Sequence, residues 1–279
     1  MRKLGIVAGG GGLPAEIASR CARTGRPYFV VRLKGFADEA TLGHPSAEIG
    51  LAELGKVFKT LRAEQCEAVC FAGTVARPDF GKLKPDIRGM AALPSIIAAG
   101  RKGDDGLLRA VLDEFRKEGF AIEGAHEAAA SMTLPLGILG TVSPAESCGE
   151  DIQRALVAAR AIGRLDIGQG AVVCHGLVLA VEAQEGTDAM LHRVRGLPEA
   201  IRGAPGRMAG VLAKAPKPIQ STDVDLPTIG VTTVRGAAQA GLAGIVGEAG
   251  RLLIVNREET VAMANDLGLF ILGVEAKDE

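Results

Sequence analysis

The stretch Lys3-Leu-Gly-Ile-Val-Ala-Gly-Gly-Gly-Gly-Leu-Pro14 decides the fold of the N-terminal half. Its apolar run predicts a short buried strand, and apolar residues recur at helical spacing after the proline. In α/β proteins a strand, a glycine loop and a helix often bind phosphate, because glycines let backbone N–H groups approach the anion at the helix N-terminus. The stretch predicts a Rossmann-like domain with ligand contacts at Gly10, Gly11, Gly12 and Leu13; a tight turn without a ligand is the alternative.

The end of the second predicted strand, Tyr28–Leu33, bears on which ligand this loop takes. The glycine spacing is not GxGxxG, and Arg32 and Lys34 stand where a dinucleotide site usually places an acid for the ribose. We therefore favour a nucleotide or nucleotide-sugar over NAD as the ligand.

A third predicted strand, Ala68–Ala72, runs into Gly73 and Thr74. Ligands sit at the carboxyl ends of the strands in a parallel sheet, so we expect these two residues beside the first glycine loop. The Thr74 hydroxyl would either bind a phosphate or ribose, or cap a helix.

Composition limits the class of protein. The chain has 279 residues, 47% of them hydrophobic and 23% charged, which suits one large or two modest globular domains. A net charge of −1 and the absence of Trp argue against a nucleic-acid partner. No apolar run reaches the roughly 20 residues that span a bilayer, and the N-terminus lacks a signal peptide's apolar core. The five cysteines include no CxxC, so we expect reduced, mostly buried thiols in a cytoplasmic protein.

The second half is predicted to be a separate domain. Residues 135–148 are rich in proline and glycine without helical periodicity, so we place a linker there. The N-terminal Rossmann-like domain then comprises residues 1–134, and a mixed α/β domain comprises residues 149–279. Within it, His175-Gly176 predicts a hairpin turn, and Thr228–Val234 is expected to be extended.

Two acidic residues flank a predicted helix start in this second domain. In Glu185-Gly-Thr-Asp188 the glycine ends a strand and the following Thr-Asp pair can cap a helix. Carboxylates of Glu185 and Asp188 would cluster there, either to bind a metal or to stabilise the helix N-terminus, and the spacing favours the cap.

The stretch from Lys214 to Gly230 carries the strongest chemical pattern. Its three prolines forbid a helix, and Lys214 and Lys217 precede Asp223 and Asp225. In an extended chain both carboxylates point to one side, where they could hold Mg²⁺ while the lysines hold phosphate. A solvated acidic loop is the alternative.

Four segments together resemble a known family. They are Gly9–Pro14, Gln169-Gly170, Val181–Met190 and Lys214–Gly230. The chain resembles, over essentially its whole length, the LpxI family of UDP-2,3-diacylglucosamine pyrophosphatases. The glycine loop alone does not distinguish this family from others. Two elements taken together do: Glu-Gly-Thr-Asp and Lys-Pro-x-Gln…Asp-x-Pro-Thr-x-Gly. The family tends to have Gln-Asp-x-Arg-x-Asp where this chain has Gln-Ser-Thr-Asp-Val-Asp225, so Asp225 matches the pattern.

The resemblance implies a hydrolase of lipid A biosynthesis. It would split UDP-2,3-diacylglucosamine into UMP and 2,3-diacylglucosamine 1-phosphate (lipid X), with Mg²⁺ and water attack at the β-phosphorus. It also implies two domains that hold the lipid, a homodimer, and transient contact of a cytoplasmic protein with the inner membrane. A nucleotide-sugar oxidoreductase using NAD(P) and a non-catalytic carrier of lipid or nucleotide are the alternatives; a catalytic Tyr-Lys or Cys-His pair is not evident in the sequence.

The predicted site residues combine this resemblance with the patterns above. The predicted catalytic residues are Asp225, Asp188 and Lys214. The predicted Mg²⁺ ligands are Asp225, Asp188 and Glu185. The predicted substrate contacts are Gly10, Gly11, Gly12, Leu13, Gly73, Thr74, Gln169, Gly170, Gln220 and Thr228.

Overall fold

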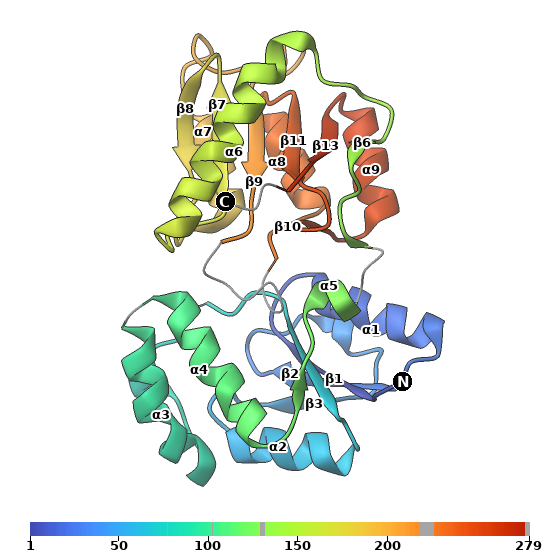
Figure 1. The fold of residues 1–279 in the computed structure, drawn as a ribbon, viewed down its shortest axis with the longest axis vertical. Coiled ribbons are helices and arrows are strands. Elements are labelled where there is room, and N and C mark those ends of the chain that lie inside the picture. The colour runs from blue at the N-terminus through green and yellow to red at the C-terminus, as the bar shows by residue number, and fades with distance from the viewer. Residues whose placement is uncertain (77, 102, 129–131, 218–225, 277–279) are drawn as a thin grey trace. The chain divides into compact units, whose positions relative to one another are not determined.

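The computed structural model describes residues 1–76, 78–101, 103–128, 132–217 and 226–276 of the chain. The described residues group into two compact units, one up to Ala128 and one from Met132 (Figure 1). Both units are α/β, with a parallel sheet in the first and a mixed sheet in the second, as the sequence predicts.

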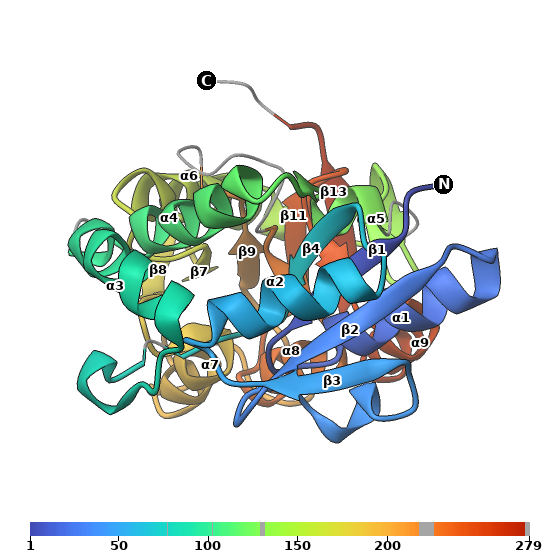
Figure 2. The ribbon, with the colours of Figure 1, turned by 90° about the horizontal axis from the view of Figure 1, so that it is seen from below.

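The first unit is built on a five-stranded parallel sheet in the order β3-β2-β1-β4-β5. Figure 2 shows β2 and β3 running side by side at one end of it. This is the strand order of a Rossmann-like half. Its strands are β1 (Leu4–Ala8), β2 (Tyr28–Leu33), β3 (Ser46–Ile49), β4 (Ala68–Ala72) and β5 (Ala121–Ile122). Its helices are α1 (Leu13–Thr24), the 3₁₀ turn η1 (Glu39–Thr41), α2 (Leu54–Ala63), η2 (Phe80–Lys82), α3 (Ile87–Gly100), α4 (Asp104–Lys117) and α5 (Ala125–Ala128).

Alternation along the strands divides the first unit's core between the two faces of the sheet. Val7, Val31 and Val69 pack with buried side chains of α2, α3 and α4, including Phe58 and Phe115, whose rings meet edge to face. Helix α1 packs against β1 and β2. The apolar strands are buried on both faces, which is why they read as continuous hydrophobic runs.

The second unit has a six-stranded mixed sheet in the order β6-β13-β11-β9-β7-β8 and a two-stranded pair, β10-β12. Strands β9, β11 and β13 are parallel, and β6 and β7 run antiparallel to their neighbours. Its strands are β6 (Gly137–Leu139), β7 (Gly170–Cys174), β8 (Leu177–Val181), β9 (Val211–Lys214), β10 (Thr228–Ile229), β11 (Gly244–Glu248), β12 (Leu253–Ile254) and β13 (Phe270–Val274). Its helices are η4 (Glu146–Cys148), α6 (Gly149–Arg164), α7 (Gly186–Arg195), α8 (Val231–Gln239) and α9 (Arg257–Asp266).

Helices cover both faces of the second sheet. Helix α6 packs its small residues Ala155 and Ala159 on one face, and α7, α8 and α9 form a single core with the other. Strand β6 comes from the proline- and glycine-rich segment 135–148 and pairs with β13 at the sheet edge. That segment therefore contributes a strand to the second unit.

The structure corrects one expectation in this unit. The sequence predicts an extended segment over Thr228–Val234, but only its first two residues form a strand, β10, and helix α8 begins at Val231. Burial of Thr233 and Val234 against the core outweighs the weak helix propensity of this run.

The cysteine prediction is confirmed: all five thiols are free and buried. Burial raises the pKa of Cys66 to about 11 and of Cys70 to about 12, which keeps both thiols protonated and unreactive. Among the described residues, no helix has both the length and the hydropathy to cross a bilayer.

Candidate functional site

The glycine loop of the first unit lies where the strand order of its sheet reverses, between β1 and β4. The backbones of Gly10 and Thr74 form an antiparallel bridge there, with N–H···O distances of 2.8 and 2.9 Å. The predicted meeting of Gly73 and Thr74 with the first loop is confirmed. Ligands of open α/β sheets bind in the crevice at such a point, outside the carboxyl ends of the strands.

Close backbone approach explains two glycines at this point. A Cβ on Gly73 would overlap the carbonyl oxygen of Gly10, and the φ of Gly73 is +86°. A Cβ on Gly9 would lie 2.6 Å from the carbonyl oxygen of Thr74. The two loops therefore meet backbone to backbone, and a side chain at either position would push them apart.

An acid that the sequence patterns did not reveal reaches this loop. The Gly11 N–H donates to Oδ2 of Asp38 at 2.6 Å, from the residue that precedes η1. Arg32 and Lys34 stand at the end of β2 as the sequence analysis notes, and the carboxylate arrives instead from the loop beyond Leu33. The glycine loop binds an anionic oxygen supplied by the chain itself, and helix α1 begins directly after it at Leu13 with Gly12 as its N-cap.

The second unit presents polar groups at the end of its mixed sheet where the parallel strands finish. Strands β9, β11 and β13 have their carboxyl ends there, and the antiparallel β7 begins there. The Glu182 N–H donates to the Gly170 carbonyl at 2.8 Å, and the Ala215 N–H donates to the Gln169 carbonyl at 2.9 Å. The predicted substrate contacts Gln169 and Gly170 and the predicted catalytic residue Lys214 are thus neighbours.

Lys214, the last residue of β9, is the central cation of this edge. Its side chain is buried, with 6% of the residue exposed. Nζ donates to Thr187 Oγ1 at 2.7 Å and to the Thr228 carbonyl oxygen at 3.2 Å. A buried ammonium needs such acceptors, because leaving its N–H groups unpaired away from water is costly. The structure therefore unites two predicted residues, Lys214 and Thr228.

Glu182 and Thr187 complete this cluster, and neither was predicted as a site residue. Thr187 Oγ1 donates to Glu182 Oε1 at 2.7 Å, and Glu182 is 9% exposed. Glu182 Oε2 is buried and has no hydrogen-bond partner among the described residues. One feature of the sequence could have pointed to Glu182: it is an acidic residue directly after the apolar run of β8. Burying a carboxylate is costly, so an acid in such a position often has a specific role.

Two glycines make room for Glu182. A Cβ on Gly168 would overlap the Glu182 carbonyl oxygen, and a Cβ on Gly170 would lie 2.7 Å from Glu182 Oε2. The carboxylate is therefore held against the backbone at the start of β7.

This packing makes Gly170→Ala a sensitive test. We expect the variant to displace the Glu182 carboxylate and to lower the free energy of unfolding by about 1–3 kcal/mol, as overpacking usually does. Thermal or urea unfolding measures this. Gly149→Ala is the control for a methyl group added without crowding, since Gly149 has a φ of −58° and no atom within 4 Å of the position that a Cβ would occupy, and we expect it to stay close to wild type in stability. A Gly170→Ala protein as stable as the wild type would contradict the tight packing around Glu182.

The two carboxylates of the Glu-Gly-Thr-Asp segment have different surroundings. Glu185 accepts from Arg193 at 2.5 Å, and backbone hydrogen bonding at the helix start together with this guanidinium lowers the pKa of Glu185. Asp188 is exposed in the first turn of α7. Across the described ranges no three His, Cys, Asp or Glu side chains gather as a metal site. Asp225 and Gln220 lie outside the described residues, so the predicted Mg²⁺ set stays a prediction.

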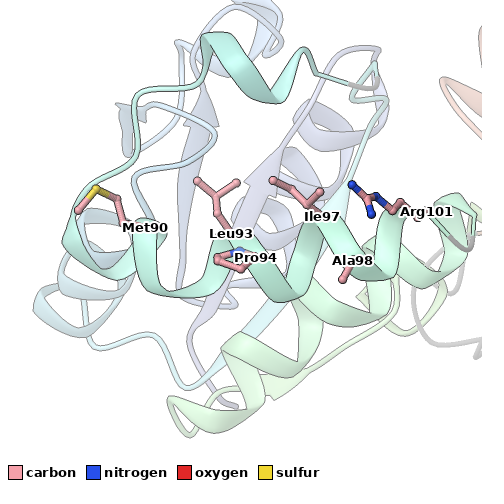
Figure 3. A pocket seen from close by; sticks show the side chains of 6 residues that line it. All are labelled: Met90, Leu93, Pro94, Ile97, Ala98 and Arg101. Atoms are coloured by element: carbon pink, nitrogen blue, oxygen red, sulfur yellow. The ribbon is translucent and has the colours of Figure 1, made fainter.

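A hollow on helix α3 has a different character. It has a volume of about 600 Å³ and is lined along one side of the helix (Figure 3). The lining residues are Met90, Leu93, Pro94, Ile97, Ala98 and Arg101. Apart from one guanidinium, this lining offers no acid, base or nucleophile. We therefore place the candidate chemistry at the Lys214 cluster, where buried charged groups converge.

Comparison with known proteins gives matches over both units. The LpxI N-terminal domain family matches residues 3–132, and the LpxI C-terminal domain family matches residues 135–272. The UDP-2,3-diacylglucosamine pyrophosphatase LpxI of Caulobacter vibrioides is 66% identical over 278 residues, covering 100% of this chain and 99% of that protein.

Two solved structures are more distant. The precorrin-6A reductase CobK is 12% identical with a TM-score of 0.32, covering 100% of this chain and 89% of the other. The UDP-glucose 4-epimerase of Thermus thermophilus in complex with NAD is 14% identical with a TM-score of 0.30, covering 99% and 85%. Similarity this low supports no conclusion about function.

Proposed function

The chain belongs to the LpxI family, and we propose that it hydrolyses the pyrophosphate bond of UDP-2,3-diacylglucosamine. The observation that carries the proposal is 66% identity, over the whole chain, to a protein named for this activity. Water would add its oxygen to one phosphorus as the bond from that phosphorus to the bridging oxygen breaks. The products are UMP and 2,3-diacylglucosamine 1-phosphate (lipid X), which would place the reaction in lipid A biosynthesis.

The buried cation suits phosphoryl chemistry. Such a reaction needs positive groups that are already positioned where negative charge accumulates on the phosphoryl oxygens. Lys214 has two acceptors among the described residues, Thr187 and Thr228, and an ammonium has three N–H groups. We propose that the third N–H binds a phosphoryl oxygen of the substrate.

The glycine loop of the first unit suits the nucleotide or the sugar. Its backbone N–H at Gly11 already binds a carboxylate oxygen of Asp38. We propose that Gly10, Gly12 and Thr74 contact the uridine diphosphate or the sugar, and that Asp38 accepts a hydrogen bond from a hydroxyl of the bound ligand.

Two of the three predicted Mg²⁺ ligands, Asp188 and Asp225, have the donor chemistry that this ion prefers. Mg²⁺ is usually bound by one or two carboxylates, waters and substrate phosphates, so Asp188 and Asp225 would be enough protein ligands. Glu185 fits less well, because its carboxylate is bound to Arg193. When bound, the metal would neutralise charge on the phosphates.

The substrate carries two acyl chains, so it must be drawn from a lipid surface. We expect a cytoplasmic protein in transient contact with the inner membrane, since burying each CH₂ contributes about 0.8 kcal/mol. The homodimer that the family resemblance implies stays a prediction.

Hydrolysis in ¹⁸O-labelled water, with and without Mg²⁺, tests the proposal. We expect Mg²⁺-dependent release of UMP with the label in lipid X, which means attack at the β-phosphorus. Label in UMP would move the attack to the α-phosphorus and keep the hydrolase. Retention of bound lipid without release of UMP under either condition would contradict the proposal and favour a carrier.

The oxidoreductase alternative can be tested directly, because Asp38 supplies an acid near the glycine loop, as dinucleotide sites usually do. Titration with NADPH and NADH, followed by the change in nicotinamide fluorescence, measures dinucleotide binding. We expect no saturable change, since the family match points to a pyrophosphatase.

A further inference from the structure

A chain of three hydrogen-bonded side chains runs through the second unit. Lys214 Nζ donates to Thr187, and Thr187 donates to Glu182, each at 2.7 Å. The three side chains come from the end of β9, the first turn of α7 and the residue after β8. Glu182 and Lys214 are both more than nine-tenths buried, and Thr187 connects them.

The single hydroxyl hydrogen of Thr187 fixes the direction of this chain. A threonine hydroxyl has one hydrogen to donate and lone pairs to accept. Because that hydrogen goes to Glu182, the hydroxyl oxygen is turned toward Lys214 as an acceptor. The Thr228 carbonyl takes a second N–H of the ammonium. Two fixed acceptors set the direction of the third N–H.

Glu182 lies close to two glycines. A Cβ on Gly168 would overlap its carbonyl oxygen, and a Cβ on Gly170 would lie 2.7 Å from its Oε2. Its Oε2 is enclosed and has no hydrogen-bond partner among the described residues. A buried polar oxygen without a donor destabilises a fold. Among the described residues, the side-chain hydrogen bond that this carboxylate makes is the one that Oε1 accepts from Thr187.

We infer that Glu182 is a positioning residue, which acts through the Thr187 hydroxyl to aim the Lys214 ammonium at a phosphoryl oxygen of the substrate. This inference rests on the proposed function. The enclosed Oε2 is not open to substrate, so Glu182 itself neither contacts phosphate nor activates water. Its role is to orient Thr187, which in turn orients Lys214.

Variants of Thr187 test the inference with little change in shape. Thr187→Val removes the hydroxyl and keeps the branched side chain, and Thr187→Ser keeps the hydroxyl. We expect Thr187→Val to lower kcat by about 10²-fold, the scale of a misplaced catalytic group, and Thr187→Ser to stay close to wild type. Most of the loss should fall on kcat, because the aimed N–H matters most in the transition state.

Variants of Glu182 should follow the same logic. Glu182→Ala removes the acceptor of Thr187 and should lower kcat as Thr187→Val does. Glu182→Gln keeps an acceptor oxygen in the same place and should recover most of the activity. A Glu182→Gln protein as impaired as Glu182→Ala would overturn the positioning route.

Thr260 provides a matched control for the loss of a buried hydroxyl. It lies in the same unit, is fully buried, and donates to the Val255 carbonyl at 2.7 Å. We expect Thr260→Val to lower thermal stability while kcat of the folded protein stays unchanged. In a Lys214→Met background, Thr187→Val should cause no further loss, since it acts through Lys214. Wild-type kcat in Thr187→Val, or an additive loss in that background, would overturn the inference.

A second readout separates this inference from the proposed function. Acetylation of Lys214 by acetic anhydride, followed by mass spectrometry, measures how firmly its amine is held. We expect faster labelling in Thr187→Val and Glu182→Ala than in wild type and Thr187→Ser. Wild-type protein that releases no UMP would contradict the proposed function alone. Equal labelling in all four proteins would contradict the positioning of Lys214.

Discussion

Lys214→Met is expected to lower kcat for UDP-2,3-diacylglucosamine hydrolysis by about 10²–10³-fold, the loss typical when one preorganised donor to a transition-state oxyanion is removed. Methionine has a similar length and fills the buried space, so the ammonium is the main group lost. Lys214 is held by Thr187 and Thr228 rather than by a carboxylate, so its charge is not neutralised by direct contact with an acid among the described residues. Steady-state release of UMP measures the change.

Two further variants keep this result interpretable. Arg202 is another buried cation of the same unit, and it donates to the backbone carbonyls of Leu197 and Gly203. Arg202→Met should lower stability while kcat of the folded protein is kept. Lys214→Arg keeps the charge but changes its geometry, so it should fall between wild type and Lys214→Met. If Lys214→Met turned over at the wild-type rate, the phosphate role of this lysine would be wrong.

Much of the first unit could be predicted because its signals are local. The run into the four glycines fixes β1 and the loop, and apolar periodicity marks α1 and α2. The rule that parallel strands present ligands at their carboxyl ends then predicts that Thr74 lies beside the loop. These predictions needed only short-range patterns and one topological rule.

Asp38 and Glu182 were missed because their roles depend on contacts distant in sequence. Asp38 meets Gly11, 27 residues away, from a loop whose path no periodicity reveals. Glu182 sits beside residues that look like an ordinary helix cap, and only the close approach of Gly170 shows that its carboxylate is enclosed. Arg193, in the last turn of α7, binds Glu185 at the start of the same helix, eight residues earlier. Hydrophobic patterning does not predict this ion pair.

Helix α3, for which the sequence patterns above give no prediction, contains residues that disfavour a helix. Pro94 lies inside it, and Gly89 near its start is buried so closely against Ala52 that no side chain would fit. Both residues suggest a loop, although Asp86 caps the helix through the Gly89 N–H at 2.7 Å. The tertiary packing of α3 against α2 and α4 outweighs the local cost.

Asp225→Asn is the second large expected loss, and its neighbour Asp223 provides the matched control. Both lie outside the described residues, and their roles are inferred from the sequence. In the family resemblance drawn from the sequence, Asp225 stands at a position that matches the family's pattern and Asp223 at one that departs from it. We propose that the Asp225 carboxylate holds Mg²⁺ or orients the attacking water. Its loss should then lower kcat by about 10²–10⁴-fold, the contribution of a positioned acid–base group, while Asp223→Asn stays near wild type.

The response to Mg²⁺ separates the two roles of Asp225. A lost metal ligand weakens the affinity for Mg²⁺, so a high Mg²⁺ concentration should recover part of the activity of Asp225→Asn. A lost water-orienting group leaves the Mg²⁺ dependence unchanged and lowers kcat at every concentration. In both cases lipid X should still bind, because the fold and the apolar contacts are intact. Equal losses in Asp223→Asn and Asp225→Asn would instead assign the function to the pair of carboxylates, and wild-type turnover in Asp225→Asn would remove this residue from the mechanism.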